Sequence, residues 1–203
     1  MKPSITFSII LLLLCFNFSY GQEYRFDQLV KSKFPTTYNP NQEFTNLFNT
    51  EDYSYHMTIH RQNDSLISRI FDTKTSKVHY FNIEKAETLN LKYLYTEAIK
   101  TFPNDYSYEF SDIKEKDGVK AVVFKVLNKR KIAVAKYHLN IKETEENNFS
   151  VYQLSTLETL LFADIIPPYN FIVLKSKGRN TSGNHTSYEL KSIEVVNFVV
   201  TIP

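Results

Sequence analysis

The chain has 203 residues and is poor in three residue types: it contains one cysteine, four glycines and no tryptophan. The single cysteine, Cys15, lies in the apolar segment near the start, so no internal disulfide bond can stabilise the chain and stability must come from packing. With so few glycines, the sequence has no glycine-rich phosphate-binding loop. The patterns H-E-x-x-H and G-x-S-x-G are also missing. The sequence therefore predicts no cofactor, no metal site and no enzyme activity.

Charges of the two signs nearly cancel. The chain carries 24 Lys and Arg against 22 Asp and Glu, a formal net charge of +2. Proteins that bind nucleic acids neutralise backbone phosphates with clustered basic side chains, and no basic stripe is visible in this sequence. We therefore expect no nucleic-acid partner.

Residues 1–21 have the pattern of a cleavable signal peptide. Lys2 precedes an apolar run that ends at Phe16, and the small residues Ser19 and Gly21 suit cleavage after Gly21. The run is shorter than the about 20 apolar residues that a membrane-spanning helix needs. We therefore expect an exported protein, periplasmic or secreted.

Removal of the signal would leave residues 22–203, which we expect to form a single β-rich domain without a membrane span. A lipid anchor on Cys15 is one alternative, although Leu14 is not the small residue that a lipobox has at that position. A retained membrane anchor is the other alternative.

Aromatic residues are abundant, with 14 Tyr and 16 Phe, and such residues favour half-buried strands. From Tyr53 to His60, apolar and polar side chains alternate, which predicts a strand with one buried face and one solvent face. Similar runs recur about every 10–12 residues with polar turns between them, and Asp117-Gly118 is a strong hairpin signal. The strand over residues 188–202 breaks its alternation around residues 194–197, where one bulge would restore it.

Two segments have helical spacing instead. Leucines between residues 151 and 165 predict a helix, with Ser155 and Glu158 as a capping box, and residues 43–48 suit one helical turn. A sheet of many strands usually curls or closes. We therefore predict a mainly β fold: a strongly curved antiparallel sheet of about 9–10 strands, an open or half barrel. The helix near 151–165 would lie over its mouth or its concave face.

Two of the five histidines, His56 and His60, lie on one face of the first alternating strand. Four residues of extended chain separate their side chains by roughly 13 Å, so the pair cannot hold one metal ion without further ligands. We expect both histidines on the solvent face.

The aromatic excess is the feature that suggests a function. Side chains that recur at two-residue spacing would line the concave side of the sheet as an apolar trough with a few polar tips. Such a trough suits a lipid or another apolar ligand, and the alternative is an ordinary core beneath the helix. The residues predicted to bind the ligand are Tyr53, Tyr55, Tyr93, Tyr95, Tyr106, Tyr108 and Phe110.

A resemblance rests on the leader ending in Tyr20-Gly21-Gln22, the body rich in Tyr, Lys and Asn, and the leucine-rich segment before Pro167-Pro168. In these features the chain resembles uncharacterised secreted proteins of Bacteroidota, some of which share the half-barrel of periplasmic lipoprotein carriers. The Gly-Leu-Pro-Gly-Leu-Ile signature of one such family is absent, so no functional residue is transferred. The resemblance implies an envelope protein that shields or ferries an apolar ligand.

The leading hypothesis is a non-enzymatic cell-envelope or secreted protein that binds an apolar ligand in a groove of its curved sheet. The alternative is a structural or interaction protein that docks a partner through its surface or a sheet edge. A groove lined by apolar atoms favours the first, and a filled core with an exposed aromatic patch favours the second. An enzyme ranks third, because it needs titratable groups that converge in a pocket.

Overall fold

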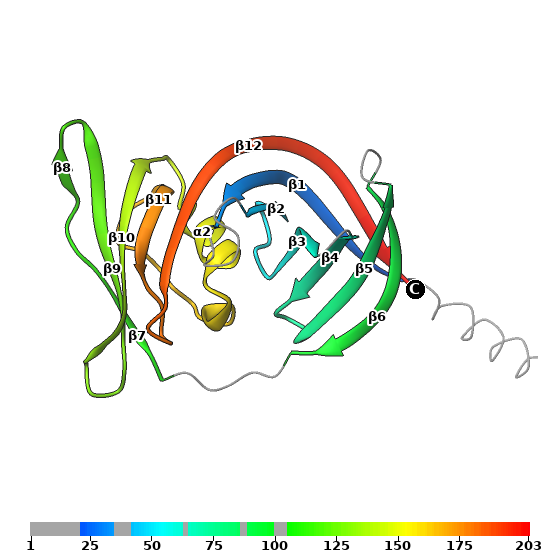
Figure 1. Ribbon diagram of the computed structural model, residues 1–203, viewed down its shortest axis with the longest axis horizontal. Coiled ribbons are helices and arrows are strands. Elements are labelled where there is room, and N and C mark those ends of the chain that lie inside the picture. The colour runs from blue at the N-terminus through cyan, green and yellow to red at the C-terminus, as the bar shows by residue number, and fades with distance from the viewer. Residues whose placement is uncertain (1–20, 35–41, 63–64, 86–88, 100–104) are drawn as a thin grey trace, which may run out of the picture.

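One sheet contains almost all of the regular structure. The computed structural model describes residues 21–34, 42–62, 65–85, 89–99 and 105–203, and Figure 1 shows a strongly curved sheet with a helix inside the curve. All strand pairs are antiparallel, in the order β6-β5-β4-β3-β2-β1-β12-β11-β10-β9-β7, with β8 beside β9. The strands are β1 (Gln22–Lys33), β2 (Glu43–Phe48), β3 (Tyr55–Gln62), β4 (Ser65–Asp72), β5 (Lys77–Lys85), β6 (Asn90–Ala98), β7 (Ser107–Phe110), β8 (Lys114–Lys116), β9 (Val119–Leu127), β10 (Ala133–Glu143), β11 (Phe171–Arg179) and β12 (His185–Ile202).

The predicted fold class is confirmed. Most strands pair with their neighbours in the sequence, as in an antiparallel meander. Among the described residues the two end strands, β6 and β7, do not pair with each other, so the sheet is an open half barrel. It has twelve strands instead of the predicted 9–10. At the turn between β8 and β9, Asp117 and Gly118 have positive φ angles of 52° and 74°, as the hairpin signal requires.

The longest strand, β12, carries the bulge that its broken alternation predicted. Phe26 of β1 pairs with Phe198, and Gln28 pairs with Val195, so β12 has one residue more than β1 in this interval. The extra residue lies within 196–197, inside the predicted segment. A bulge of this kind increases the local bend of a strand, and Figure 1 shows β1 and β12 arching across the molecule.

The helix α2 (Phe149–Thr156) is followed by a 3-10 turn, η2 (Glu158–Leu160). Its position agrees with the prediction, although it begins and ends earlier than the predicted 151–165. The N-cap residue is Asn148, so the capping box predicted at Ser155 is wrong: that serine lies near the C-terminal end of α2. In the part of the chain that the structure describes, no helix is long and apolar enough to cross a membrane.

Residues 43–48 form β2, so the helical turn predicted there is wrong. Leu47 pairs with Leu29 of β1 on one side and with Met57 of β3 on the other. The last three residues of β2 are all buried, which means that both faces of this strand are covered. Over only six residues, a strand buried on both faces has the same apolar pattern as a helical turn.

Both faces of the sheet are covered around Phe48 of β2 and His56 of β3. The helix-side face carries Phe48, which packs with Val151 and Leu154 of α2. The prediction of a solvent face on β3 is therefore wrong, because His56, on the same face as Phe48, is only 1% exposed. The opposite face packs against the ends of β1 and β12 through Tyr24, Phe26, Leu47, Met57, Ile59, Ile70, Phe81, Val200 and Ile202.

Aromatic packing fixes α2 to the other half of the sheet. Phe149 and Tyr152 are buried in a core with Phe124 of β9, Tyr137 of β10 and Phe171 of β11. The ring centroids of Phe149 and Phe124 are 5.4 Å apart in an edge-to-face arrangement. The start of α2 is therefore held by β9–β11, while Leu154 near its end reaches the half that contains β2–β4.

Candidate functional site

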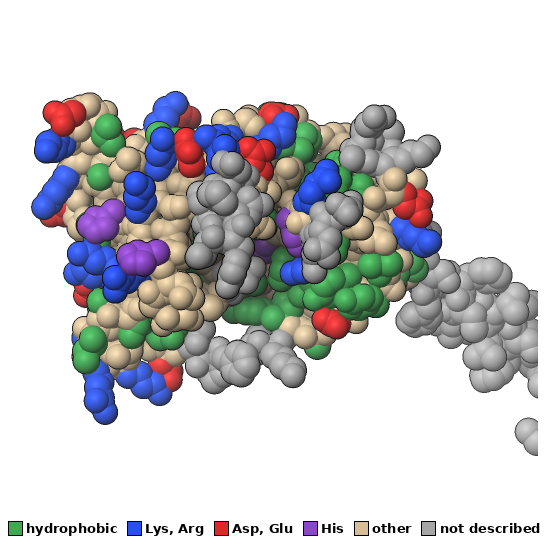
Figure 2. All heavy atoms as spheres, in the orientation of Figure 1, with side chains coloured by type: hydrophobic (Ala, Val, Ile, Leu, Met, Phe, Trp, Pro, Cys, Tyr) green, Lys and Arg blue, Asp and Glu red, His purple; other side chains and the backbone are tan. Residues whose placement is uncertain are grey.

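A hollow of about 240 Å³ lies between α2 and the helix-side face of β2, β3 and β4. We call it the central hollow. In Figure 2 the middle of the visible face is hollowed, with histidine and hydrophobic atoms in and beside the recess. The helical segment, by which we mean α2, η2 and the turn that follows them, contributes Leu154, Ser155 and Leu161 to the wall of this hollow. From the strands come Phe44, Asn46, His56, Thr58, His60, Arg69 and Phe71.

The register of the sheet places a row of side chains across the floor of this hollow. Asn46 pairs with Thr58, Thr58 with Arg69, Arg69 with Tyr80, and Tyr80 with Tyr95. Directly paired residues share one face of a sheet, so the row runs from β2 to the end strand β6. The Arg69 guanidinium carbon lies 5.5 Å from the Tyr80 ring centre, and the stacked rings of Tyr80 and Tyr95 are 4.6 Å apart. These contacts align the arginine along the floor.

Both histidines of the hollow are neutral near pH 7. The ring of His56 lies between Phe48 and Phe71, with centroid distances of 6.0 and 5.1 Å, and burial lowers the pKa of His56 to about 3. Burial, and then the charge of Arg69, also lower the pKa of His60. Among the described residues that line the hollow, Arg69 is therefore the one charged side chain. The Nδ1 atom of His56 and the Nε atom of Arg69 are buried without a hydrogen-bond partner.

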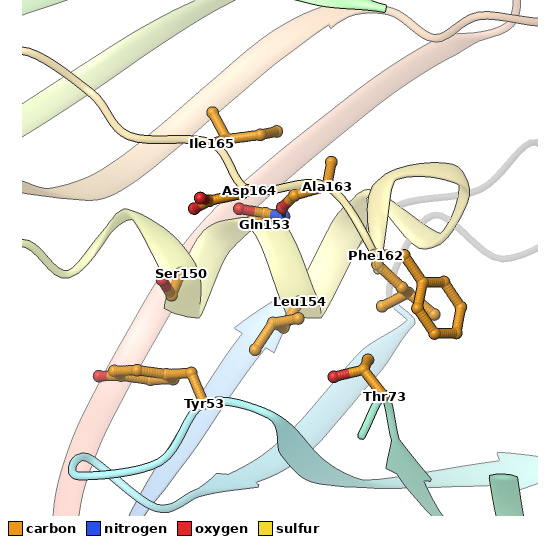
Figure 3. Close-up of a pocket in the computed structure, with 10 residues that line it drawn as sticks. Tyr53, Thr73, Ser150, Gln153, Leu154, Phe162, Ala163, Asp164 and Ile165 are labelled. Atoms are coloured by element: carbon orange, nitrogen blue, oxygen red, sulfur yellow. Dashed lines mark hydrogen bonds between the residues drawn. The ribbon is translucent and has the colours of Figure 1, made fainter. Parts of the chain in front are cut away.

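A second hollow, of about 390 Å³, adjoins the first along α2. We call it the flanking hollow. It shares Leu154 and Leu161 with the central hollow and is closed on the sheet side by Tyr53 and Thr73. Figure 3 shows Leu154 of α2 pointing toward Tyr53 and Thr73. Leu154 therefore lies between the central hollow and the flanking hollow and contributes to the walls of both.

A third hollow, of about 240 Å³, shares Phe44 and Ser155 with the central hollow. The three hollows thus follow the end of α2 between the helix and the sheet. The segment after α2 is tied to the helix by Gln153, whose Nε2 atom donates hydrogen bonds to the carbonyl oxygens of Leu160 at 2.9 Å and Ala163 at 2.8 Å. These two hydrogen bonds hold one wall of the flanking hollow in place.

The aromatic residues predicted to bind a ligand lie in different parts of the structure. Tyr53 lines the flanking hollow, and Tyr95 ends the row that crosses the central hollow. Tyr93 lines a separate pocket of about 370 Å³ between β5, β6 and the end of β12. Tyr55 packs edge-to-face against Tyr24, with ring centroids 5.0 Å apart.

The other three predicted residues, Tyr106, Tyr108 and Phe110, pack against the core of β9–β11. Phe110 stacks on Phe124 at 4.9 Å and meets Phe149 of α2 at 5.3 Å. The seven aromatic residues are therefore not brought together in one trough. They are distributed over the flanking hollow, the exposed end strand β6, a separate pocket and two cores.

Sequence reasoning missed the polar floor of the central hollow. Thr58 and His60 were assigned to solvent, and Arg69 was not singled out. One signal was present: Arg69 stands between Ile67 and Phe71 at two-residue spacing, which places an arginine in an apolar row of its strand. An arginine at such a position is rarely buried without a partner, so it merits attention as a binding residue.

A second polar cluster lies on the opposite face of the sheet. The Tyr24 hydroxyl donates a hydrogen bond to Asp72 Oδ2 at 2.8 Å and lies 2.9 Å from His79 Nε2. His79 Nδ1 is in turn 2.6 Å from the Thr96 hydroxyl. Burial, followed by the hydrogen bond to Asp72, raises the pKa of Tyr24. This network joins β1, β4, β5 and β6 and fixes their relative positions.

Metal binding has no support in the described ranges, where no three His, Cys, Asp or Glu side chains cluster to hold an ion.

No protein-family model and no curated protein matches the sequence. One similar solved structure is a LolA superfamily protein from Nitrosomonas europaea. The alignment covers 88% of each chain with 6% sequence identity and a TM-score of 0.31. These values do not place the chain in that superfamily.

Proposed function

We propose that the protein is a non-enzymatic, exported binding protein that holds an apolar ligand, such as a lipid, alongside α2. The observation that carries this proposal is the set of three adjoining hollows between α2 and the sheet, of about 390, 240 and 240 Å³. Ligand sites are typically concave, about 300–1,000 Å³ in volume, and mostly apolar with a few polar groups. The flanking hollow reaches that range by itself, and the two smaller hollows adjoin it.

The way α2 is held supports this function. Phe149 and Tyr152 bury the start of the helix in the core of β9–β11, whereas Leu154 and Ser155 near its end line hollows. The end of the helix is held as well, because Leu154 packs with Phe48 and Ser155 accepts a hydrogen bond from Asn46 of β2. The space beneath it therefore persists without a ligand, which reduces the ordering cost of binding one.

Export is part of the proposal and rests on the sequence pattern of residues 1–21. All of these residues except Gly21 lie outside the part of the chain that the structure describes. The assignment of residues 22–203 to one domain is likewise a proposal. An exported chain meets lipids at the membranes of the envelope, where a carrier or a shield for an apolar molecule has a use.

Filling the space beside α2 tests the proposal. Ser155 lines both the central and the third hollow, and its Oγ accepts a hydrogen bond from Asn46 Nδ2 at 3.2 Å. Ser155→Trp should weaken binding of the neutral fluorescent probe N-phenyl-1-naphthylamine at least about tenfold, because the indole occupies the volume that the probe needs. The measurement is a fluorescence titration of the purified protein.

Two variants control for other effects of the substitution. Ser182→Trp adds the same side chain at an exposed position in the turn between β11 and β12, and Ser155→Ala removes the hydrogen bond to Asn46 without filling the hollow. Both should bind the probe within about twofold of wild type. A wild type that takes up no probe, or a Ser155→Trp variant that binds as well as wild type, would show that the hollows are not the ligand site.

The alternative, a docking role, is favoured by one observation. On β12, Val195 is 93% exposed, and Ile193 and Val199 on the same strand are 39% and 45% exposed. Exposed apolar residues that lie close together are typical of partner surfaces. This alternative becomes the better account if the wild type binds no apolar probe.

A further inference from the structure

The central hollow contains a positive charge with no negative charge beside it. Arg69 is half-buried, its Nε atom has no hydrogen-bond partner, and no carboxylate lines the hollow among the described residues. None of the ten ion pairs found in the described ranges includes Arg69. Glu97 of β6 accepts a hydrogen bond from the Tyr80 hydroxyl at 3.1 Å instead. A buried N–H without an acceptor is unfavourable, so the Nε atom of Arg69 indicates a missing acceptor beside this charge.

A second unpartnered polar group belongs to a residue that lines the same hollow. His56 is 1% exposed, lines the central hollow, and has an Nδ1 atom without a hydrogen-bond partner. The rings of Phe48 and Phe71 cover both of its faces, so water does not reach the imidazole from either side. Buried polar groups in proteins are almost always hydrogen-bonded, and an exception calls for an explanation such as a ligand.

Apolar side chains lie beside these polar groups. Phe44 and Phe71 line the central hollow from the sheet, and Leu154 and Leu161 line it from the helical segment and continue into the flanking hollow. A molecule that satisfies the whole groove therefore needs one anionic, hydrogen-bonding end and one hydrocarbon end. The exposed carboxylate of Asp164 lines the flanking hollow, so the anionic end is disfavoured there and favoured beside Arg69.

We propose that the central hollow binds the anionic head group of a single-chain amphiphile, of the class of long-chain carboxylates, with Arg69 as its counter-ion and the hydrocarbon chain lying along α2. This inference rests on the proposed function and specifies its ligand. The guanidinium group pairs with a carboxylate or phosphate through two parallel hydrogen bonds, which a neutral head group cannot form. The stacked rings of Tyr80 and Tyr95 continue the same row to the end strand β6.

Titration calorimetry at pH 7 with a matched set of probes tests the head group on the wild type alone. Dodecanoate should bind at least about 10-fold more tightly than dodecanol, because a hydrogen bond to a charged group contributes more than one to a neutral group. Dodecyltrimethylammonium should bind more weakly than dodecanol. Acetate should show no binding at concentrations that saturate the protein with dodecanoate.

Substitution of the arginine locates the effect. Arg69→Gln should weaken dodecanoate binding at least about 10-fold and leave dodecanol within about twofold, because only the ion pair is removed. Arg61→Gln is the matched control: Arg61 is an exposed arginine on β3 that pairs with Leu66 and does not line the hollow, and this variant should bind both probes as wild type does. Thermal unfolding of each variant verifies that it is folded, and if Arg69→Gln does not fold, the wild-type probe set still decides.

The outcomes separate the two proposals. If neither dodecanoate nor dodecanol binds, the proposed function fails and this inference fails with it. If both bind equally, or if Arg69→Gln weakens both alike, the apolar site stands and the head-group site is overturned. If acetate binds as tightly as dodecanoate, the site takes a small anion, and the amphiphile is overturned. Binding of dodecyl phosphate that depends on Arg69 supports the head-group site. The ratio of the dissociation constants of dodecyl phosphate and dodecanoate then identifies the preferred head group.

Discussion

Replacing Phe149 by alanine should release the start of α2 from the sheet. Phe149 is fully buried, and its ring centroid lies 5.3 Å from Phe110, 5.4 Å from Phe124 and 6.0 Å from Phe171. Buried Phe→Ala substitutions typically cost about 3–5 kcal/mol, through lost transfer free energy and the cavity left behind. The three aromatic partners place Phe149 in the upper half of that range, since each ring pair adds about 0.5–1.5 kcal/mol beyond burial.

Urea unfolding measures this cost as the difference in the free energy of unfolding between variant and wild type. Phe162→Ala is the matched control, because Phe162 lies in the same helical segment but is 43% exposed, and it should cost less than about 1 kcal/mol. Phe149→Ala should also weaken binding of the apolar probe, because the helix forms one wall of the hollows. A loss of stability below about 1 kcal/mol, or one equal to that of Phe162→Ala, would refute the argument that aromatic packing anchors α2.

Two further predictions concern acid. The pKa of His56 is about 3 in the folded protein, against 6.5 unperturbed. Between these two pH values the unfolded chain therefore binds more protons than the folded protein. The free energy of unfolding consequently falls by up to about 1.4 kcal/mol for each pH unit below 6.5. His56→Phe should flatten this slope in urea unfolding at pH 7 and pH 5, and an unchanged slope would contradict the burial of a neutral imidazole. For Asp72, burial raises the pKa, but hydrogen bonds from the Thr75 amide and the Tyr24 hydroxyl lower it by more, leaving it below 3.8. The stabilisation by the ionised Asp72 carboxylate is present above pH 3.8 and is lost as the pH falls through the folded pKa. Asp72→Asn should therefore lower the free energy of unfolding by about 1–3 kcal/mol at pH 7 and by progressively less in acid. A loss that does not change with pH would contradict the assignment.

Local patterns were sufficient to predict most strands. From Ala135 to Lys142 apolar and polar side chains alternate, and Tyr137, Leu139 and Ile141 of the apolar set are buried in the structure. Asp117-Gly118 predicted its hairpin because the positive φ angles of that turn depend on only two residues. The β12 bulge followed from a break in one strand's own alternation.

Predictions that depended on distant contacts failed. Residues 43–48 pair with β1 and β3, and no pattern within six residues shows that both faces of a segment will be covered. The helix α2 starts at Phe149 because this residue packs in the core of β9–β11. That packing decides where the helix begins, and the capping residues near Ser155 do not. Tertiary packing overrides local preference in both cases.

The polar floor of the candidate site could not be found from one strand at a time. Asn46, Thr58 and Arg69 come from three strands, and they share a floor only because of the sheet register. His56 was assigned to solvent because the alternation of β3 does not reveal that α2 covers its polar face. The curvature was predictable, and so was a helix at the mouth or on the concave face of the sheet (Figure 1), but which strands that helix would cover was not.

The central claim is that the space along α2 holds an apolar molecule. Mass spectrometry tests this directly on protein that is purified from its source cells without detergent and measured intact and then after organic extraction. The account predicts about one amphiphile per chain in the wild type and a strong reduction in Ser155→Trp prepared in the same way. Wild-type protein that is folded, free of any bound lipid and unable to take up dodecanoate would contradict it.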